Sequence, residues 1–348
     1  MLTVPAARVL SSWTASADEA PDLGPAALAV LLAETGDAAA HSVVRAALPK
    51  WLSGAVRPSA RVGLHGGMAG TLLGVQLIAR LHPPAARLAG RVSAWIEDHL
   101  DRHPWRTSQL RYPDYDVISG SAGLALAGVK RGEDHLDRLG SLRVGGHEGD
   151  PLSGWIQGGI DTGMAHGAAG VLTARPNREL ADWLAAESYR DGLGVLSWAR
   201  RAREGAPPPP HAVNRQAWCY GTPGIAWALW VGGAREQATE AMLSLCAAWD
   251  PEVHLTGSTG DRLGLCHGAA GVLLVADAFA RHADLGEAAS LRDRVERYLL
   301  DRLDTVRELA ATDLGLLTGA CGVLCALLTV RGGHRGWLSC LGLTPPEG

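Results

Sequence analysis

Lysine, phenylalanine and long apolar runs are all scarce in this sequence. Its 348 residues include two lysines, Lys50 and Lys130, and one phenylalanine. The remaining positive charge is arginine, which is scattered along the chain, and the net charge is −4. Nucleic acid is therefore not an expected partner. No window reaches the roughly 18 to 20 uninterrupted apolar residues that a membrane span requires, so we expect no membrane span.

The first residues of the chain also lack the pattern of an exported protein. MLTVPAARVLSSW has no basic start followed by a long apolar stretch, so we expect no signal peptide and a cytoplasmic protein. The composition, with 47% hydrophobic and 20% charged residues, is typical of a globular protein with a sizeable core. Six cysteines in such a chain are expected to be core residues, metal ligands or catalytic groups rather than disulfides.

One short pattern, Gly-x-x-Gly followed by an apolar run, recurs along the whole chain. The steps between the first glycines of successive copies are 53, 47, 54, 47 and 51 residues. A degenerate copy at 24–27 precedes the others, so the sequence indicates six clear repeats and a seventh. A constant period of this size is typical of repeat architectures. The clear copies are 67–70, 120–123, 167–170, 221–224, 268–271 and 319–322.

Each repeat has room for two helices in different surroundings. The segment after each motif is apolar nearly all round, as in 271–280, which predicts a buried helix. Buried inner helices alternating with amphipathic outer helices predict an all-α protein, a closed α/α toroid of about seven helical hairpins. An open solenoid would need polar capping repeats, and the last repeat stays apolar over 323–330. The amphipathic segments are 87–100, 177–188, 235–248 and 288–303.

The repeats continue without an obvious interruption. We find no strand-like alternation of useful length and no domain linker, so we expect a single domain over residues 1–348. The strongest loop signal is segment 204–211, which contains four consecutive prolines. The repeated glycines are expected to serve mainly the close packing of the inner helices.

When the repeats are aligned on their first glycine, reactive side chains share one register. The position directly before that glycine holds His166, Tyr220 and His267, and the position before it holds Cys219 and Cys266. Equivalent positions in a ring of repeats lie at the same height. We therefore expect these side chains, from three consecutive repeats, to converge at one mouth of the ring, near the N-termini of the inner helices.

Two cysteines and one histidine form a ligand set suited to zinc. Structural zinc sites usually close with four protein ligands and C-x-x-C pairs, and this sequence has no C-x-x-C and no fourth ligand in register. Cys219, Cys266 and His267 therefore predict one catalytic zinc ion with an open position for a substrate thiolate or a hydrolytic water. The alternative, three ordinary core residues, is disfavoured by their shared register. We expect the other cysteines to stay outside the site: Cys246, Cys321, Cys325 and Cys340.

Other polar side chains are candidates for the same mouth. His166 would serve as an acid or base near the metal. Asp116 precedes Gly120 by four residues and could face the cavity, or be a helix cap or a surface acid. Arg215, four residues before Cys219, has an ordinary solvated arginine as its alternative. For His65 we expect core or rim packing.

The segments that carry these residues resemble the LanC-type lanthipeptide cyclases. The resemblance extends through the repeats over nearly the whole chain and rests most specifically on RQAWCYGTPGI at 215–225, LCHG at 265–268 and AHGAAG at 165–170. It implies a seven-repeat α/α toroid with one zinc ion at the central mouth. It also implies the family reaction, a Michael-type addition of peptide cysteine thiols to dehydroalanine or dehydrobutyrine that closes lanthionine and methyllanthionine rings.

The resemblance also implies roles for individual residues. Cys219, Cys266 and His267 match the zinc ligands of the family, and His166 matches its active-site histidine. The family mechanism has zinc activating the incoming thiolate and a proton reaching the resulting enolate. His166 is the candidate donor, and a zinc-bound water is the alternative. Three further residues match active-site positions of the family, namely Asp116, Arg215 and Tyr220. Asp116 would orient His166, and Arg215 would offer charge to the enolate oxygen.

The implied substrate is a dehydrated precursor peptide. No kinase or dehydratase region is present, so we expect a separate dehydratase as a partner, with a transporter complex as a further candidate. Two other functions would use the same scaffold: addition of glutathione to dehydroamino acids in damaged proteins, or peptide binding without catalysis. An α/α-barrel glycosidase would need paired acids at the cavity, and Asp116 has no partner in register.

Overall fold

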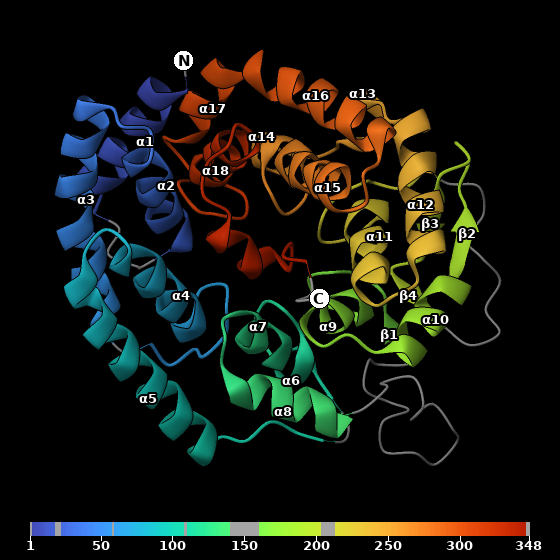
Figure 1. Ribbon diagram of the computed structural model, residues 1–348, viewed down its shortest axis with the longest axis horizontal. Helices are drawn as coiled ribbons and strands as arrows, with labels where there is room; N and C mark the ends of the chain where they lie inside the picture. The colour runs from blue at the N-terminus through green and yellow to red at the C-terminus, as the bar shows by residue number, and fades with distance from the viewer. Residues whose placement is uncertain are drawn as a thin grey trace.

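The computed structural model describes residues 2–17, 22–57, 59–107, 110–139, 160–202 and 213–345. In these ranges the protein is built mainly of helices, which form two concentric rings around a common axis (Figure 1). None of the helices in the described ranges combines the length and the apolar character needed to cross a bilayer.

The inner ring contains seven helices within the described ranges. They contact one another in sequence order from α7 onward, α18 packs against α2, and α2 packs against α4. The loops in front of α4 and α7 are joined by a hydrogen bond from the His65 N–H to the Ile118 carbonyl, which completes the ring. The helices are α2 (Leu23–Ala33), α4 (Met68–Ala79), α7 (Ser121–Leu126), α9 (Ala168–Ala174), α11 (Thr222–Val231), α15 (Ala269–His282) and α18 (Ala320–Val330). The predicted toroid is confirmed, and the degenerate motif at 24–27 does begin an inner helix.

The outer ring surrounds the inner ring (Figure 1) and contains seven helices within the described ranges. Its members are α1 (Thr3–Ala15), α3 (Ala38–Ala55), α5 (Ala86–Arg102), α8 (Lys130–Leu139), α10 (Arg178–Ala186), α12 (Arg235–Ala248) and α16 (Gly286–Leu300). The N-terminal helix α1 packs against α3 and also contacts α18, so the two ends of the chain meet in the ring. Short elements fill the connections: η1 (Pro83–Ala85), α6 (Tyr112–Tyr115), α13 (Pro251–His254), α14 (Thr259–Leu263), α17 (Leu303–Leu309) and η2 (Gly336–Leu341).

Hydrophobic patterning explains which helices lie inside. Helix α15 is buried at every residue from Ala269 to Phe279, and only its last turn reaches the surface. Helix α5 buries one residue in four, and these residues line one face of the helix: Leu88, Val92, Ile96 and Leu100. Each fully buried aliphatic side chain of this kind stabilises the fold by roughly 1.5–3 kcal/mol. A helix that is apolar on all sides gains this stabilisation fully only inside the ring. A helix with one apolar face packs that face against the inner helices and leaves its polar face to solvent.

The second glycine of the motif is required by a close approach of two backbone segments. A Cβ atom added at Gly224 would lie 2.1 Å from the Trp218 carbonyl oxygen, and one at Gly271 would lie 2.1 Å from the Leu265 carbonyl oxygen. Any side chain here would therefore push away the loop that precedes the inner helix. The glycines hold these loops against the first helical turn, which is the packing role expected for them.

Four short strands were not expected from the sequence. Strand β1 (Ile160–Asp161) pairs with β4 (Arg201–Ala202), and β2 (Ser188–Arg190) pairs with β3 (Leu196–Trp198), both antiparallel. Strands of two or three residues are too short to show an alternating pattern, so the sequence offers no signal for them. The predicted proline-rich loop at 204–211 lies outside the described residues.

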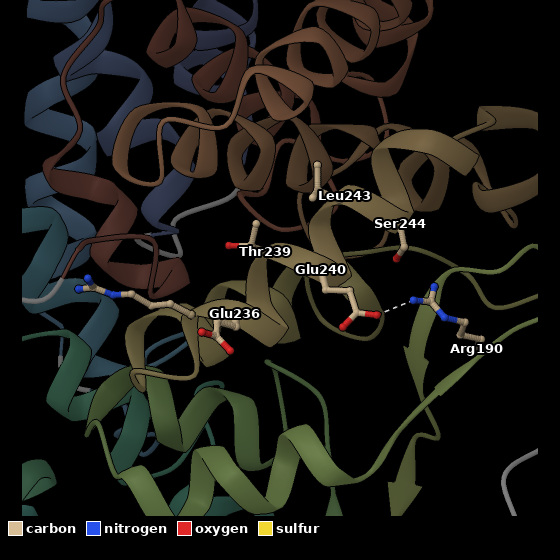
Figure 2. Close-up of a pocket in the computed structure, with 7 residues that line it drawn as sticks. Arg190, Glu236, Thr239, Glu240, Leu243 and Ser244 are labelled. Atoms are coloured by element: carbon tan, nitrogen blue, oxygen red, sulfur yellow. Dashed lines mark hydrogen bonds and ion pairs between the residues drawn. The ribbon is translucent and has the colours of Figure 1, made fainter.

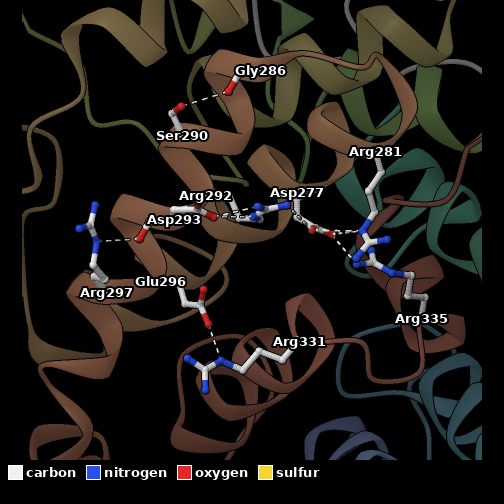
Figure 3. Close-up of polar contacts among 10 residues, drawn as sticks. All are labelled: Asp277, Arg281, Gly286, Ser290, Arg292, Asp293, Glu296, Arg297, Arg331 and Arg335. Carbon is white, nitrogen blue, oxygen red and sulfur yellow. Dashed lines mark hydrogen bonds and ion pairs between the residues drawn. The ribbon is translucent and has the colours of Figure 1, made fainter.

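The C-terminal segment fills the middle of the ring, where η2 lies close to α4 and α7 (Figure 1). Two buried tryptophans hold it by hydrogen bonds: Trp218 Nε1 donates to the Leu341 carbonyl at 2.9 Å, and Trp227 Nε1 donates to the Gly342 carbonyl at 2.8 Å. At the start of the segment, Arg335 Nη2 lies 2.5 Å from the buried Asp277 carboxylate of α15 (Figure 3). The segment therefore forms part of the core.

Candidate metal centre

A belt of backbone hydrogen bonds joins the loops that precede successive inner helices. Each bond links one loop to the next, so residues roughly one repeat apart in sequence become neighbours in space. Five loops from consecutive repeats thereby line one mouth of the ring, and four of them carry the candidate residues. In each bond a backbone N–H donates to a backbone carbonyl oxygen: Val117 to Ala165 (3.1 Å), Met164 to Cys219 (2.8 Å), Cys219 to Cys266 (3.1 Å) and Cys266 to Leu317 (2.8 Å).

Cys219, Cys266 and His267 come together at this mouth. Their two sulfur atoms and one ring nitrogen all lie within 4.8 Å of one another, and Cys266 Sγ is 3.7 Å from His267 Nε2. With zinc–sulfur bonds of about 2.3 Å and zinc–nitrogen bonds of about 2.1 Å, a tetrahedral site separates such ligands by about 3.6 Å. The donors present therefore fit a zinc ion. Among the described residues, no fourth cysteine, histidine or carboxylate joins the group.

The surroundings of the two thiols bear on their ionisation. Both cysteines are buried, with Cys219 1% and Cys266 8% exposed. Hydrogen bonding to Cys266, together with burial, raises the pKa of the Cys219 thiol above its ordinary value. A divalent cation held between the sulfurs would supply the charge that favours thiolates instead.

The second ring nitrogen of His267 faces a carboxylate. Nδ1 lies 3.0 Å from Oδ1 of Asp261 in α14, and Nε2 faces the cysteines. The Ser258 hydroxyl and N–H both donate to the other oxygen of Asp261, at 2.8 and 3.1 Å, and these bonds lower the pKa of Asp261. Hydrogen bonding to Cys219 raises the pKa of His267. The contact between Nδ1 and Asp261 is an ion-pair contact and not a hydrogen bond, so the carboxylate acts on the ring through its negative charge.

His166 and Asp116 form a close pair on two neighbouring loops. His166 Nδ1 lies 2.5 Å from Asp116 Oδ2. Asp116 is fully buried, and its Oδ1 accepts the N–H groups of Ser119 at 2.7 Å and Gly120 at 2.8 Å. The carboxylate thus caps its own loop and orients the histidine. The His166 side chain itself is 32% exposed, so it remains accessible from the mouth.

The remaining two predicted residues lie beside the three-ligand group. The Tyr220 hydroxyl donates to Asp161 Oδ2 at 2.8 Å, and burial raises the pKa of Tyr220. The Arg215 Nη2 atom donates to the Thr256 carbonyl at 2.9 Å, and Arg215 lies close enough to His267 and Asp261 to influence the pKa of both. In the described part of the chain, the side-chain hydrogen bonds of Arg215 all go to Thr256.

Sequence reasoning missed two carboxylates at this mouth, Asp161 and Asp261. Asp261 had a weak signal, since Ser258 and Asp261 form a capping box that begins α14. Asp161 had none, because it precedes Gly167 by six residues, whereas Asp116 precedes Gly120 by four. His65 packs as expected: its Nε2 lies 3.1 Å from the Cys340 carbonyl, and burial lowers its pKa to about 4.

The other four cysteines are buried elsewhere. All six cysteines are free, as expected for a chain without disulfides. None of these four belongs to the Cys219–Cys266–His267 group. Cys246 lies in α12, Cys321 and Cys325 lie in α18, and Cys340 lies in η2.

A cavity of about 730 Å³ is lined by none of the residues of the metal centre (Figure 2). It opens between Arg190 of β2 and one face of α12, and Arg190 pairs with Glu240 across it at 2.5 Å. Its described lining carries opposite charges and two hydroxyl groups, Thr239 and Ser244, but no cysteine or histidine, and the Ser244 hydroxyl already bonds the backbone of Leu196 and Ala241. The chemistry therefore belongs to the mouth of the ring rather than to this cavity.

A closed ring of helical hairpins with a Cys-Cys-His group at one mouth defines the class of this protein. The chain belongs to the family described as lanthionine synthetase C-like protein, which it matches over residues 26–341. Its fold is similar to that of nisin cyclase, with a TM-score of 0.76 and 17% sequence identity over 97% of this chain and 96% of that chain. No curated protein sequence matches the chain at a significant level.

Proposed function

We propose that this protein is a zinc-dependent cyclase that closes lanthionine and methyllanthionine rings in a dehydrated peptide. The observation that carries the proposal is the meeting of two groups at one mouth. The Cys219–Cys266–His267 group suits a thiol-activating metal, and the His166–Asp116 pair suits proton transfer. Membership of the lanthionine synthetase C-like family and the fold of nisin cyclase support the same reaction class.

The metal would be held by residues of two adjacent repeats. Cys219, Cys266 and His267 would be its three protein ligands, with the negative charge of Asp261 behind the histidine. Bound zinc supplies Lewis-acid stabilisation of a substrate thiolate, which lowers the pKa of the thiol towards neutrality. Because the protein provides three ligands, one coordination position is left for the substrate.

The addition itself needs a proton donor more than a nucleophile from the protein. The peptide cysteine sulfur forms a bond to the β-carbon of the dehydroamino acid, and the electrons of the double bond move to an enolate. The α-carbon then takes a proton, so that S–H has been added across C=C and no atom is lost. His166 is the proposed donor, with Asp116 holding its Nδ1 and leaving Nε2 for the proton.

Two more residues have proposed supporting roles. The Arg215 guanidinium, fixed by Thr256, would place positive charge near the developing enolate oxygen. Tyr220 follows the first ligand in sequence and borders the same mouth. The substrate would be a precursor peptide dehydrated by a separate protein in the cytoplasm, since a ring closure of this kind needs dehydroamino acids already formed.

Ring closure can be tested with a synthetic peptide that contains one dehydroalanine and one cysteine several residues apart. Cyclisation leaves the mass unchanged, so the remaining free thiol is counted by alkylation and mass spectrometry. We expect the zinc-loaded protein to remove the alkylatable thiol much faster than buffer does. The variant Cys266→Ala should lose both zinc and activity, and Cys246→Ala, with a buried cysteine outside the site, should retain them.

Two competing functions are outcomes of the same experiment. Added glutathione would appear as a mass increase on the dehydroalanine, and preference for this product over the ring would assign the protein to glutathione addition. If the zinc-loaded protein binds the peptide but accelerates neither reaction, it is a peptide-binding scaffold and the proposal is wrong. The His166–Asp116 pair argues against a scaffold, because simple binding has no use for an oriented proton donor.

A further inference from the structure

One carboxylate at the mouth has no place in the roles considered so far. Asp161 ends β1, five residues before His166, and is fully buried. Its Oδ1 accepts the Gly163 N–H at 3.0 Å. Its Oδ2 accepts the hydroxyls of Tyr220 at 2.8 Å and Tyr112 at 3.4 Å. A buried carboxylate with donors on both oxygens is strongly fixed in place.

The two tyrosines that Asp161 holds border both halves of the site. Tyr220 is the neighbour of the ligand Cys219 in the chain. The Tyr112 ring packs against the His166 ring, with centroids 4.9 Å apart. A single side chain is therefore hydrogen-bonded to one residue beside the metal ligands and to another beside the proposed proton donor.

The Tyr220 ring is restrained on other sides as well. A Cβ atom added at Gly163 would lie 2.5 Å from the Tyr220 ring, so the ring packs directly on the glycine backbone. The Arg200 guanidinium lies over the ring, 4.9 Å from its centroid. Asp161 Oδ2 accepts the Tyr220 hydroxyl at 2.8 Å and lies 4.0 Å from Arg200 Nε, so the carboxylate holds both the hydroxyl and the guanidinium that covers the ring. With its proton donated to Asp161, Tyr220 is not free to act as the acid.

We propose that Asp161 is a positioning residue of the cyclase, which orients the Tyr220 and Tyr112 phenols around the reacting groups without touching the substrate. This inference rests on the proposed function for its kinetic consequences, and on geometry alone for its structural ones. In this proposal His166 remains the proton donor, and the oriented Tyr220 ring forms part of the wall of the mouth beside the metal ligands. The variant Asp161→Asn probes it, because an amide donates from one of the two positions where the carboxylate accepts.

The first experiment needs neither substrate nor turnover. The chain has five tyrosines, so 3-fluorotyrosine labelling gives a small set of ¹⁹F NMR signals that Tyr→Phe variants can assign. In Asp161→Asn we expect the Tyr220 and Tyr112 signals to move, while those of Tyr189 and Tyr298, which report on the fold, stay in place. An unmoved Tyr220 signal would overturn the proposal. Asp161→Ala serves as a second variant, because it removes both acceptor oxygens.

The second experiment is a double-mutant cycle on ring closure. Asp161→Asn and Tyr220→Phe should each lower kcat about tenfold with little change in KM, and the double variant should be slower than Tyr220→Phe by much less than tenfold, because only the Tyr112 contact is then left to lose. Losses that multiply would mean that Asp161 does not act through Tyr220. Zinc content should stay near that of the parent in all three. Asp191→Asn, which alters a buried carboxylate in the hairpin of β2 and β3, is the matched control.

The two experiments fail in different ways. If the parent protein closes no rings but Asp161→Asn still moves the Tyr220 signal, the proposed function is wrong and the positioning contact stands. If the parent is active and the tyrosine signals do not respond, the function stands and the role of Asp161 is wrong. A loss of zinc in Asp161→Asn would make the residue part of the support of the metal ligands, which would also overturn the positioning role.

Discussion

His166 Nδ1 lies 2.5 Å from Asp116 Oδ2, although the two residues are 50 positions apart in the chain. The contact joins successive loops of the ring at their common mouth. The second oxygen of Asp116 is already bound by the backbone N–H groups of Ser119 and Gly120. One buried carboxylate thereby shapes its own loop and selects the histidine tautomer with its proton on Nδ1, which leaves Nε2 to exchange protons.

Replacing this carboxylate by its amide should lower the rate of ring closure without changing the zinc content. In Asp116→Asn the remaining oxygen can still accept the backbone N–H groups, but the new NH₂ group faces His166 and forces the other tautomer. We expect the rate of ring closure to fall about 100-fold, the scale of a lost acid–base contribution, with zinc content unchanged. Peptide alkylation kinetics and elemental analysis measure the two quantities.

The neighbouring Asp114→Asn is the matched control for this change. Asp114 is also buried, but it binds the backbone N–H groups of Arg106 and Arg111 and does not contact His166. It should alter stability more than rate. A rate in Asp116→Asn within about threefold of the parent would remove the His166–Asp116 pair from the proposed mechanism, since its expected contribution is far larger.

The ring and the ligand group were predictable because both follow the repeat. A residue one or two places before the first motif glycine lies in the loop that the second motif glycine holds close to the inner helix, as Gly224 and Gly271 do. Cys219, Cys266 and His267 occupy those places, so sequence register translates directly into spatial proximity.

Asp161 and Asp261 could not be found in this way. They lie six and seven residues before their glycines, in loops that differ in length and path from one repeat to the next. Their contacts depend on that path: Asp161 reaches Tyr220 of the following repeat, and Asp261 turns back to His267 of its own. The short strands were not predicted for a related reason, since the pairing of strands of two or three residues depends on their tertiary neighbours.

The carboxylate behind His267 should control how tightly the metal binds. Asp261→Asn keeps the shape of the side chain but removes the negative charge 3.0 Å from Nδ1. We expect the affinity for zinc to fall about 10- to 100-fold, as for other partners of ligating histidines. Competition with a chromophoric chelator measures it. Asp304→Asn, on the exposed surface of α17, is the control, and equal affinities in the two variants would contradict the role of Asp261.

Asp277 should stabilise the fold without affecting the chemistry. This fully buried carboxylate of α15 pairs with Arg281, Arg292 and Arg335, and so ties the C-terminal segment to the ring (Figure 3). Removing one member of a buried ion-pair network leaves charges without a partner. We expect Asp277→Ala to lower the free energy of unfolding by about 3 kcal/mol, near the lower limit for such losses because the arginines are partly exposed.

Chemical denaturation with urea measures the effect of Asp277→Ala. Asp182→Asn is the control, because its ion pair with Arg178 is exposed on α10 and shares no residue with the Asp277 network. The control should change the free energy of unfolding by less than about 1 kcal/mol. A similar small change in Asp277→Ala would show that the C-terminal segment is held mainly by its apolar and tryptophan contacts.

Two buried histidines should make the fold sensitive to mild acid. Burial lowers the pKa of His135 and of His65 to about 4, from an ordinary value of 6.5. Between these values the unfolded chain binds more protons than the folded one. The contribution of these histidines to the free energy of unfolding is therefore complete above pH 6.5 and declines as the pH falls towards 4.

His135, which is 2% exposed and packs on Trp105 in the outer layer, allows a test away from the metal centre. In zinc-free protein, His135→Gln should reduce the loss of unfolding free energy over this range by up to about 3 kcal/mol. Urea titrations at several pH values measure that slope, and a slope equal to that of the parent would mean that His135 is protonated in the folded state.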